Sequence, residues 1–304
     1  MEAGGPVRHS VVVVTWNAAD VLARCLDSVR TQDVSGGIET IVVDNASTDG
    51  TQAVLERHAD HVRVIRNATN LGFSEGNNQG ARAATGDVLH FLNSDTELLQ
   101  PDALERLMLE LAKPGVGLVG PRLENPDGTL QTSCRADPTV VRSALVAVGA
   151  HRFAPNPLRV RILPAAWSHD RARDVDWVVG AALSVRADAF RYAGGFWPIH
   201  YAEEQDLARK LRRAGFRVRF LPEVRVMHVE NVSNKQRFSS PERAARTAEA
   251  ERAFLDKHLS PRRAAAIRRI TAAGHLGRSA ILRRLGHADR ADVYAAMAAP
   301  LLRP

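Results

Sequence analysis

The feature that most constrains this chain is the alternation of short β-branched runs with segments of helical apolar spacing along its first 120 residues. The run His9–Thr15 and similar runs after it predict strands at 9–15, 38–43, 62–65, 88–92 and 117–119. Apolar residues that recur every three or four positions predict helices around 21–29 and at 51–58, 74–84 and 102–112. Because each crossover returns the chain to the same end of the sheet, the strands should be mostly parallel. The sequence therefore predicts an α/β fold with helices on both faces of a central sheet.

Polar residues follow four of these predicted strands, and in open α/β sheets ligands bind at the carboxyl ends of the strands. The four groups are Asn17, Asp44-Asn45, Asn70-Leu71-Gly72 and Asn93-Ser94-Asp95. Any one group also fits a turn former or a helix cap. That structural interpretation is favoured for four residues near the second strand: Asn45, Ser47, Thr48 and Asp49. Recurrence at four strand ends nevertheless indicates one binding crevice.

Length and composition fit a globular protein, since 304 residues with 45% apolar content can bury a substantial core. The longest apolar run, 10–19, is interrupted by Asn17 and is too short to cross a bilayer. The first ten residues lack the parts of a secretory signal, so we expect a cytoplasmic protein. The two cysteines, Cys25 and Cys134, match no disulfide framework or metal clamp, and we expect buried thiols.

The formal charge of +7 lies entirely in residues 242–304, which hold 13 Lys and Arg against 6 Asp and Glu. Arginines set among Ala, Ile and Leu fit an amphipathic helix attracted to anionic lipid. They fit equally an ordinary helical appendage on the core. Aromatic residues make up only 5% of the chain, so we expect no nucleic-acid binding.

The second half of the chain begins irregularly, with a predicted hairpin turn at 125–128. Regular structure resumes with a strand at 177–185, helices at 187–192 and 204–214, and strands at 217–221 and 225–229. The core should end close to Ser240.

Three groups of polar side chains could carry chemistry. Asp95 follows a buried strand and could give a hard carboxylate oxygen to Mg²⁺ or Mn²⁺, or could cap the next helix. Glu203, Glu204 and Asp206 begin a helix, where acids complement the helix dipole. Adjacent carboxylates also raise one another's proton affinity, which suits a general base. The third group, His228 with Ser233 and Lys235, fits a diphosphate.

Taken in order, these segments resemble the family 2 glycosyltransferases with the GT-A fold, and particularly their rhamnosyltransferase-like branch. The resemblance covers residues 9–235. The matching motifs are Val14–Asn17, Val43–Thr51, Asn70–Phe73 with Gly76–Gly80 as a glycine-asparagine loop, Asn93–Asp95, Gly180–Ala181, Glu203–Leu207 and His228–Ser233.

The resemblance implies a role for each matching residue. Asp44 would bind the N3–H of a uracil or thymine ring, and Glu204 would be the base, with Glu203 or Asp206 as alternatives. Asp95 and His228 would hold the metal, Mg²⁺ or Mn²⁺, and Ser233 and Lys235 the diphosphate. The nucleotide-sugar site would comprise Thr15, Asn17, Asp44, Asn70, Gly72, Asn77, Asn93 and Ser94.

Three positions depart from the family pattern. Asn93 stands where the metal motif has its first aspartate, so Asp95 becomes the main carboxylate ligand. Glu204 stands where the base is usually aspartate, which extends the carboxylate by one methylene. Asn231 replaces a glycine, and asparagine tolerates left-handed backbone geometry better than most residues.

The resemblance also implies an organisation and a reaction. Residues 9–240 would form the catalytic domain, with a nucleotide-binding half at 9–121 and an acceptor-binding half at 122–240, followed by a basic helical extension at 241–304. The enzyme would transfer a sugar with inversion from a nucleotide-diphosphate donor, most simply L-rhamnose from dTDP-L-rhamnose. The acceptor would be a hydroxyl of a cell-surface glycan or polyprenyl-linked glycan, at the inner face of the plasma membrane.

Alternatives remain at this point. The donor could be UDP-GlcNAc, UDP-Glc or UDP-Gal, or the chain could be a catalytically degenerate relative that binds nucleotide sugars. A nucleotidyltransferase shares the α/β crevice but usually opens with a Gly-rich, basic phosphate loop, where this chain has Trp16–Ala19.

Overall fold

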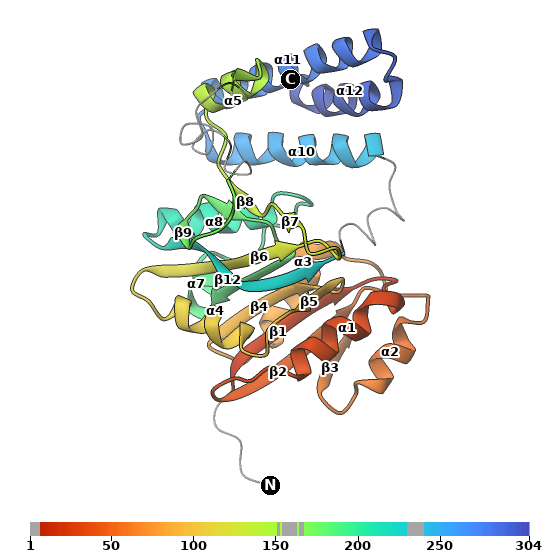
Figure 1. The fold of residues 1–304 in the computed structure, drawn as a ribbon, viewed down its shortest axis with the longest axis vertical. Helices are drawn as coiled ribbons and strands as arrows, with labels where there is room; N and C mark the ends of the chain where they lie inside the picture. The colour runs from red at the N-terminus through yellow and green to blue at the C-terminus, as the bar shows by residue number, and fades with distance from the viewer. Residues whose placement is uncertain (1–6, 151–152, 154–162, 164–166, 230–239, 304) are drawn as a thin grey trace. The chain divides into compact units, whose positions relative to one another are not determined.

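The computed structural model describes residues 7–150, 153, 163, 167–229 and 240–303. They fall into two compact units. Unit 1 comprises residues 1–135, 169–198 and 203–233, and unit 2 comprises 136–168, 199–202 and 234–304. Figure 1 shows a sheet with its helices in unit 1 and helices alone in unit 2. Residues 136–168 therefore group with the basic tail.

The first four parallel strands of unit 1 confirm the predicted alternation. They are β1 (Val7–Thr15), β2 (Gly37–Asp44), β3 (Val62–Arg66) and β4 (Val88–Asn93), in the spatial order β3-β2-β1-β4. All their pairings are parallel. Their carboxyl ends therefore lie at one edge of the sheet, as the crevice requires.

The half of the sheet beyond β4 contains both parallel and antiparallel pairings. The strand β11 (Ala182–Arg186) lies between β4 and β6 (Val116–Glu124) and is antiparallel to both. The strand β12 (Arg217–His228) pairs parallel with β6 and antiparallel with β5 (Thr96–Leu98). The two strands predicted at 217–221 and 225–229 are thus one strand. The strand predicted at 177–185 is instead divided into β10 (Trp177–Val178) and β11, with Gly180 between them.

Helices cover both faces of the sheet, as predicted. On one face α1 (Ala19–Arg30), α2 (Thr51–Arg57) and α4 (Ala103–Leu111) share a core with Val11 and Val13 of β1. On the other face α3 (Gly72–Ala83), α7 (Ala187–Tyr192) and α8 (Glu203–Arg213) share a core with Val12. Successive residues of β1 therefore serve opposite layers, which explains its continuous apolar run.

Two helix glycines bring α3 close to β1. A Cβ atom at Gly76 would lie 2.9 Å from Cγ1 of Val14, and one at Gly80 would lie 2.3 Å from Cγ1 of Val12. Any larger residue would push the helix off the sheet. The stretch 76–80, which resembles a glycine-asparagine loop, is therefore helical and packs on the sheet.

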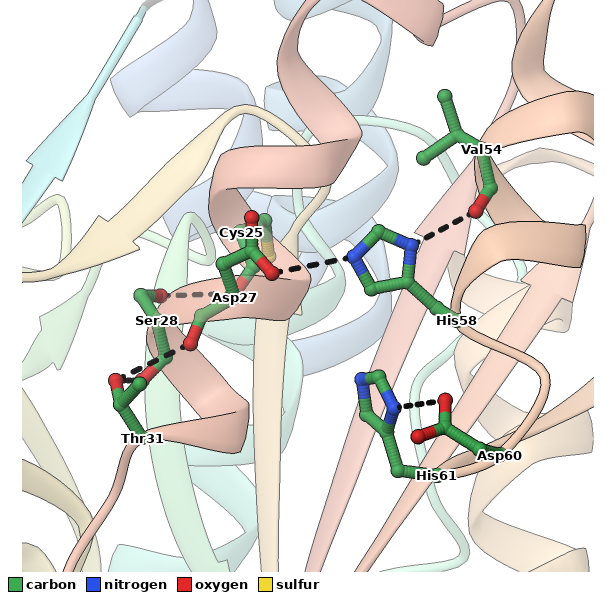
Figure 2. A network of polar contacts seen from close by, with 8 residues as sticks. All are labelled: Cys25, Asp27, Ser28, Thr31, Val54, His58, Asp60 and His61. Atoms are coloured by element: carbon green, nitrogen blue, oxygen red, sulfur yellow. Dashed lines mark hydrogen bonds and ion pairs between the residues drawn. The ribbon is translucent and has the colours of Figure 1, made fainter.

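A histidine joins α1 to α2 beside the sheet (Figure 2). His58 follows the last residue of α2, and its Nδ1 lies 2.8 Å from the carbonyl oxygen of Val54. Its Nε2 lies 3.3 Å from Oδ1 of Asp27 in α1. His58 therefore caps the end of α2 and links this helix to α1.

A pair of histidines, His9 and His90, lies buried on the neighbouring strands β1 and β4. Nδ1 of His9 lies 3.1 Å from Nε2 of His90, and Nδ1 of His90 lies 2.7 Å from Oγ of Ser184 in β11. Burial lowers the pKa of His90 well below its ordinary value, and the neighbouring His9 lowers it further. The sheet core therefore holds this pair in its neutral form.

Unit 2 is built from α5 (Val140–Ala147), α10 (Ser240–His258), α11 (Pro261–Arg284) and α12 (Ala288–Leu302). This confirms a helical C-terminal extension. Ala147 at the end of α5 fits against Gly274, where a Cβ would lie 2.8 Å from the Cβ of Ala147. Arg278 donates a hydrogen bond to the carbonyl oxygen of Val146. Within the described part of the chain, no helix combines the length and apolarity needed to span a bilayer.

Both cysteines are buried and unpaired, as expected. Burial raises the pKa of each thiol to about 12.

Candidate active site

The candidate site begins at two neighbouring strand ends, Thr15 and Asp44, which are register partners across β1 and β2. Both side chains are buried. Oδ1 of Asp44 accepts a hydrogen bond of 3.1 Å from the backbone N–H of Ser47. Asp44 thus shapes the loop that follows β2 while standing at the expected nucleotide edge.

The loop after β2 is fastened to the loop after β1. Oδ1 of Asn17 accepts from the N–H of Thr48 at 2.8 Å, and the N–H of Asn17 donates to Oγ of Ser47 at 3.0 Å. Asp49 accepts from the N–H groups of Thr51 and Ala19 at 2.9 and 3.1 Å. These are contacts of turn formers, the structural interpretation favoured for Ser47, Thr48 and Asp49. Asn17, with a φ of 48°, belongs to the same fastening.

The residues after β3 shape the start of α3. Oδ1 of Asn70 accepts from the N–H of Gly72 at 2.9 Å. Gly72 has a φ of +83°, a backbone conformation in which a residue with a side chain would be strained. Nδ2 of Asn45 donates to the carbonyl oxygen of Gly72 at 3.1 Å, which links the end of β2 to the start of α3. Asn77 is buried in the helix and donates to the carbonyl oxygen of Phe73 at 3.0 Å.

The structure brings together Asp95 and His228, which the sequence separates by 133 positions. The backbone sets this approach, because His228 is the register partner of Thr96 and the N–H of Val229 donates to the carbonyl oxygen of Asp95 at 2.9 Å. Nε2 of His228 lies 3.3 Å from Oδ1 of Asp95. Asn93 adjoins them, with its Nδ2 at 3.4 Å from the same imidazole nitrogen. Ser94 between them is buried.

This pair fits a hard or borderline divalent ion. A carboxylate oxygen and an imidazole nitrogen that face one another can both donate a lone pair to a cation between them. Among the described residues, no group of three or more His, Cys, Asp and Glu side chains is placed to hold a metal. The expected diphosphate residues Ser233 and Lys235 lie outside the described residues.

The three acidic residues of α8 have different surroundings. Asp206 is fully buried, and its Oδ2 lies 2.8 Å from Nζ of Lys210 one turn later. Glu203 is also buried. Oε1 of Glu204 accepts a hydrogen bond of 3.3 Å from the N–H of Gly180. Burial raises the pKa of Glu204. Hydrogen bonds from the backbone N–H groups of Gly180 and of Glu204 itself oppose that rise, as does the positive charge of Arg135.

Phe73 and Gly180 complete the surroundings of Glu204. A Cβ at Gly180 would lie 3.4 Å from Cζ of Phe73 and 3.5 Å from Cδ of Glu204. The beginning of α3, the β10–β11 break and the start of α8 therefore meet at Gly180, beside this carboxylate. A glycine at position 180 leaves its N–H accessible to the carboxylate. Phe73 ends the matching motif Asn70–Phe73, but no role was predicted for its side chain.

One further site residue was missed. Gln131 ends the short strand β7 (Leu130–Gln131), and its Oε1 lies 2.7 Å from Nδ1 of His228. No sequence pattern distinguishes this glutamine from other polar hairpin residues.

Comparison with known proteins identifies the family and the fold. The family description "Glycosyl transferase family 2" matches residues 10–137, and "Glycosyl transferase family group 2" matches 88–238. The chain is 30% identical to the N-acetylglucosaminyl-diphospho-decaprenol L-rhamnosyltransferase of Mycobacterium tuberculosis, over 72% of this chain and 75% of that protein. It is 29% identical to the O-antigen biosynthesis protein RfbC of Myxococcus xanthus, over 76% of this chain and 18% of that protein.

The fold is similar to that of the mannosyltransferase PcManGT from Pyrobaculum calidifontis in complex with GDP-Man and Mn²⁺. The TM-score is 0.63 with 19% identity, over 99% of this chain and 90% of the other. Similarity at this level of identity shows a shared GT-A fold. Fold, sequence and motif order agree that the chain is a glycosyltransferase and belongs to glycosyltransferase family 2, with a rhamnosyltransferase-like sequence.

Proposed function

We propose that this glycosyltransferase works by a single in-line displacement that inverts the anomeric centre, with Glu204 as general base. The observation that carries the proposal is the convergence of Glu204, Gly180 and Phe73 in the same unit as the Asp95–His228 pair. Burial raises the pKa of Glu204 and so makes its carboxylate a better proton acceptor. Glu204 would take the proton of the acceptor hydroxyl while the oxygen of that hydroxyl attacks the anomeric carbon and the nucleoside diphosphate leaves.

Asp95 and His228 would hold a divalent ion, Mg²⁺ or Mn²⁺, through one carboxylate oxygen and one imidazole nitrogen. When bound, the ion acts as a Lewis acid towards the charge of the leaving diphosphate. Asn93 contributes a neutral amide beside them. The site has one carboxylate where two are usual in this family, so metal binding should depend on the donor diphosphate.

The donor we propose is dTDP-L-rhamnose, and the acceptor a hydroxyl of a lipid-linked or cell-surface glycan. The support is the 30% identity to a relative named for rhamnosyl transfer to a decaprenol-linked sugar. Thr15, Asn17 and Asp44 would bind the base of the nucleotide at the ends of β1 and β2. A UDP-sugar donor is the alternative that the same strand ends would accommodate.

The test is a donor screen of dTDP-rhamnose, UDP-GlcNAc, UDP-Glc and UDP-Gal with Mn²⁺ and a polyprenyl-diphospho-sugar acceptor. Release of free nucleoside diphosphate with dTDP-rhamnose supports the proposed donor, and release with a UDP-sugar alone rejects it. Glu204→Gln should lower turnover at least about 100-fold, as loss of a general base does. Its melting temperature should stay near that of the wild type. Near-normal transfer by Glu204→Gln would reject the base.

Lys210→Met is the matched control for that variant, because it changes the same helix without altering Glu204. It removes one ion-pair partner of Asp206 and should lower stability while turnover per folded molecule persists. Loss of transfer in the wild type with every donor, with nucleotide binding retained, would support the degenerate relative instead.

We also propose that unit 2 binds the surface of an anionic membrane from the cytoplasmic side. The helix α11 has seven arginines and no acidic residue in its 24 residues. The apolar helix α5 beside it has no buried residue, and Val141, Val148 and Phe153 are 69%, 77% and 89% exposed. Exposed apolar side chains beside arginines are the composition of an interfacial element. Such binding would bring a lipid-linked acceptor to the same surface.

Vesicle sedimentation tests this membrane contact. The wild type should sediment with phosphatidylglycerol-containing vesicles and remain in solution with pure phosphatidylcholine. Val141→Asp with Val148→Asp should release it while leaving transfer to a soluble acceptor intact. Equal sedimentation of this variant with the anionic vesicles would reject the assignment of α5.

A further inference from the structure

The hairpin at 125–131 carries a chain of side-chain hydrogen bonds that ends on His228. We propose that this chain, through Gln131, fixes the tautomer of His228 and so presents its Nε2 lone pair to the metal. Gln131 is a positioning residue in this proposal, since it acts through the histidine. The inference rests on the proposed metal site and adds a residue that sets how well it binds.

The donor and the acceptor of each hydrogen bond follow from the carboxylate of Asp127, at the end of the chain away from His228. Thr129 lies 2.6 Å from Oδ1 of Asp127 through its hydroxyl, and a carboxylate can only accept, so the hydroxyl donates to it. Oγ1 of Thr129 is then the acceptor for Nδ2 of Asn125 at 2.9 Å. This orients the amide of Asn125 with its oxygen towards Gln131.

The same logic carries on to the histidine. Oδ1 of Asn125 accepts from Nε2 of Gln131 at 3.2 Å, so Oε1 of Gln131 faces His228. An amide oxygen only accepts, and therefore Nδ1 of His228, 2.7 Å away, carries the proton. In a neutral imidazole the other nitrogen is then bare.

That bare nitrogen has the position the metal site needs. Nε2 of His228 lies 3.3 Å from Oδ1 of Asp95, so two lone pairs face one another across a gap that a cation would fill. The opposite tautomer would aim an N–H at the carboxylate and close the site with a hydrogen bond. Fixing the second nitrogen of a ligating histidine typically changes metal affinity by about 10–100-fold.

The hairpin is held firmly enough to do this. Gln131 pairs with Leu123 of β6, and the turn closes through the N–H of Asn125 and the carbonyl oxygen of Thr129 at 2.8 Å. The N–H of Thr129 also donates to Asp127 at 3.0 Å. The turn predicted at 125–128 therefore reverses the chain and also supplies Asn125 and Asp127 to the chain of hydrogen bonds.

The experiment compares Gln131→Leu with Gln131→Glu in the full chain. Leucine removes the acceptor for Nδ1–H and glutamate keeps it. Gln131→Leu should weaken Mn²⁺ binding in the presence of dTDP by about 10–100-fold by calorimetry, raise the KM for Mn²⁺, and leave kcat at saturating Mn²⁺ near that of the wild type. Gln131→Glu should keep most of the affinity. Equal Mn²⁺ affinity of wild type and Gln131→Leu would overturn the proposal.

A matched control removes a glutamine that also bonds to the region of β12. Gln100 donates to the carbonyl oxygen of Glu223 and accepts from the N–H of Arg225, at 3.0 and 2.9 Å. Gln100→Leu should alter stability without changing Mn²⁺ affinity. A loss of affinity equal to that of Gln131→Leu would show a merely structural effect and overturn the tautomer argument.

Nitrogen-15 NMR of labelled histidine separates this proposal from the proposed function. Without metal, neutral His228 should carry its proton on Nδ1 in the wild type and populate both tautomers in Gln131→Leu. An Nε2–H tautomer in the wild type would overturn this proposal, whichever sugar the enzyme transfers. The expected tautomer together with no metal binding in the presence of dTDP would reject the metal site and leave the hydrogen-bond relay intact.

Discussion

The close approach of α3 to β1 makes a quantitative prediction for Gly80→Ala. The new Cβ would lie 2.3 Å from Cγ1 of Val12, against an ordinary separation of roughly 3.5–4 Å. The helix or the strand must therefore move by roughly 1 Å. Adding a methyl group to a packed core in this way costs about 1–3 kcal/mol. The helix propensity of alanine returns about 1 kcal/mol, so we expect a net loss of up to about 2 kcal/mol.

A glycine in α11 isolates the propensity term. A Cβ at Gly277 would meet no atom within 4 Å, and the residue is exposed. Gly277→Ala should therefore stabilise unit 2 by roughly 0.5–1 kcal/mol. Scanning calorimetry of both variants gives the two changes.

A double-mutant cycle with Val12→Ala tests the steric cause. Val12→Ala alone should destabilise by leaving a cavity, but in its background Gly80→Ala has room for its methyl group. The two changes should therefore couple by about 1 kcal/mol or more. Additive losses would refute the close approach as the reason for glycine at position 80.

Other predictions concern groups buried in the core. Because the pKa of His90 is lowered on folding, the unfolded chain takes up more protons below about pH 6.5, so stability should be complete above that pH and fall as the pH drops through it; His90→Phe should flatten a urea-midpoint profile between pH 7 and 5, and an unchanged slope would contradict the burial argument. Asp206→Asn should lower the melting temperature because it leaves the Lys210 ammonium without its buried carboxylate, whereas a melting temperature equal to the wild type would argue against that ion pair. Cys25 and Cys134 should resist iodoacetamide at pH 8 until the protein is unfolded in urea, as mass spectrometry can follow, since burial raises both pKa values to about 12; rapid labelling of the folded protein would disprove their burial.

The parallel half of the fold could be predicted because each of its strands repeats the same local pattern. The run Val11–Val14 alternates between two helix layers and is therefore apolar throughout. The antiparallel half could not be predicted in the same way. Three residues, Thr96–Leu98, make the strand β5, and no periodicity can be read from so short a segment. Their pairing with β12 depends on residues more than a hundred positions away.

The candidate site shows the same division. Asp95, His228 and Glu204 could be chosen because their residue types and their places after strands or at a helix start fit the chemistry. Gln131 could not, because a hairpin amide gains its role only from the neighbour it meets in space. Only the structure shows that the side chains of Asn17 and Asp49 join the loops after β1 and β2.

The ladder between β5 and β12 has a consequence for how such an enzyme diversifies. It fixes the separation of Asp95 and His228 through backbone pairing alone. Among the described residues that pairing joins β5 to β12, whereas α5 belongs to the other compact unit. Substitutions in α5 should therefore leave this separation unchanged, and lineages could vary that helix while the Asp95–His228 pair is inherited intact.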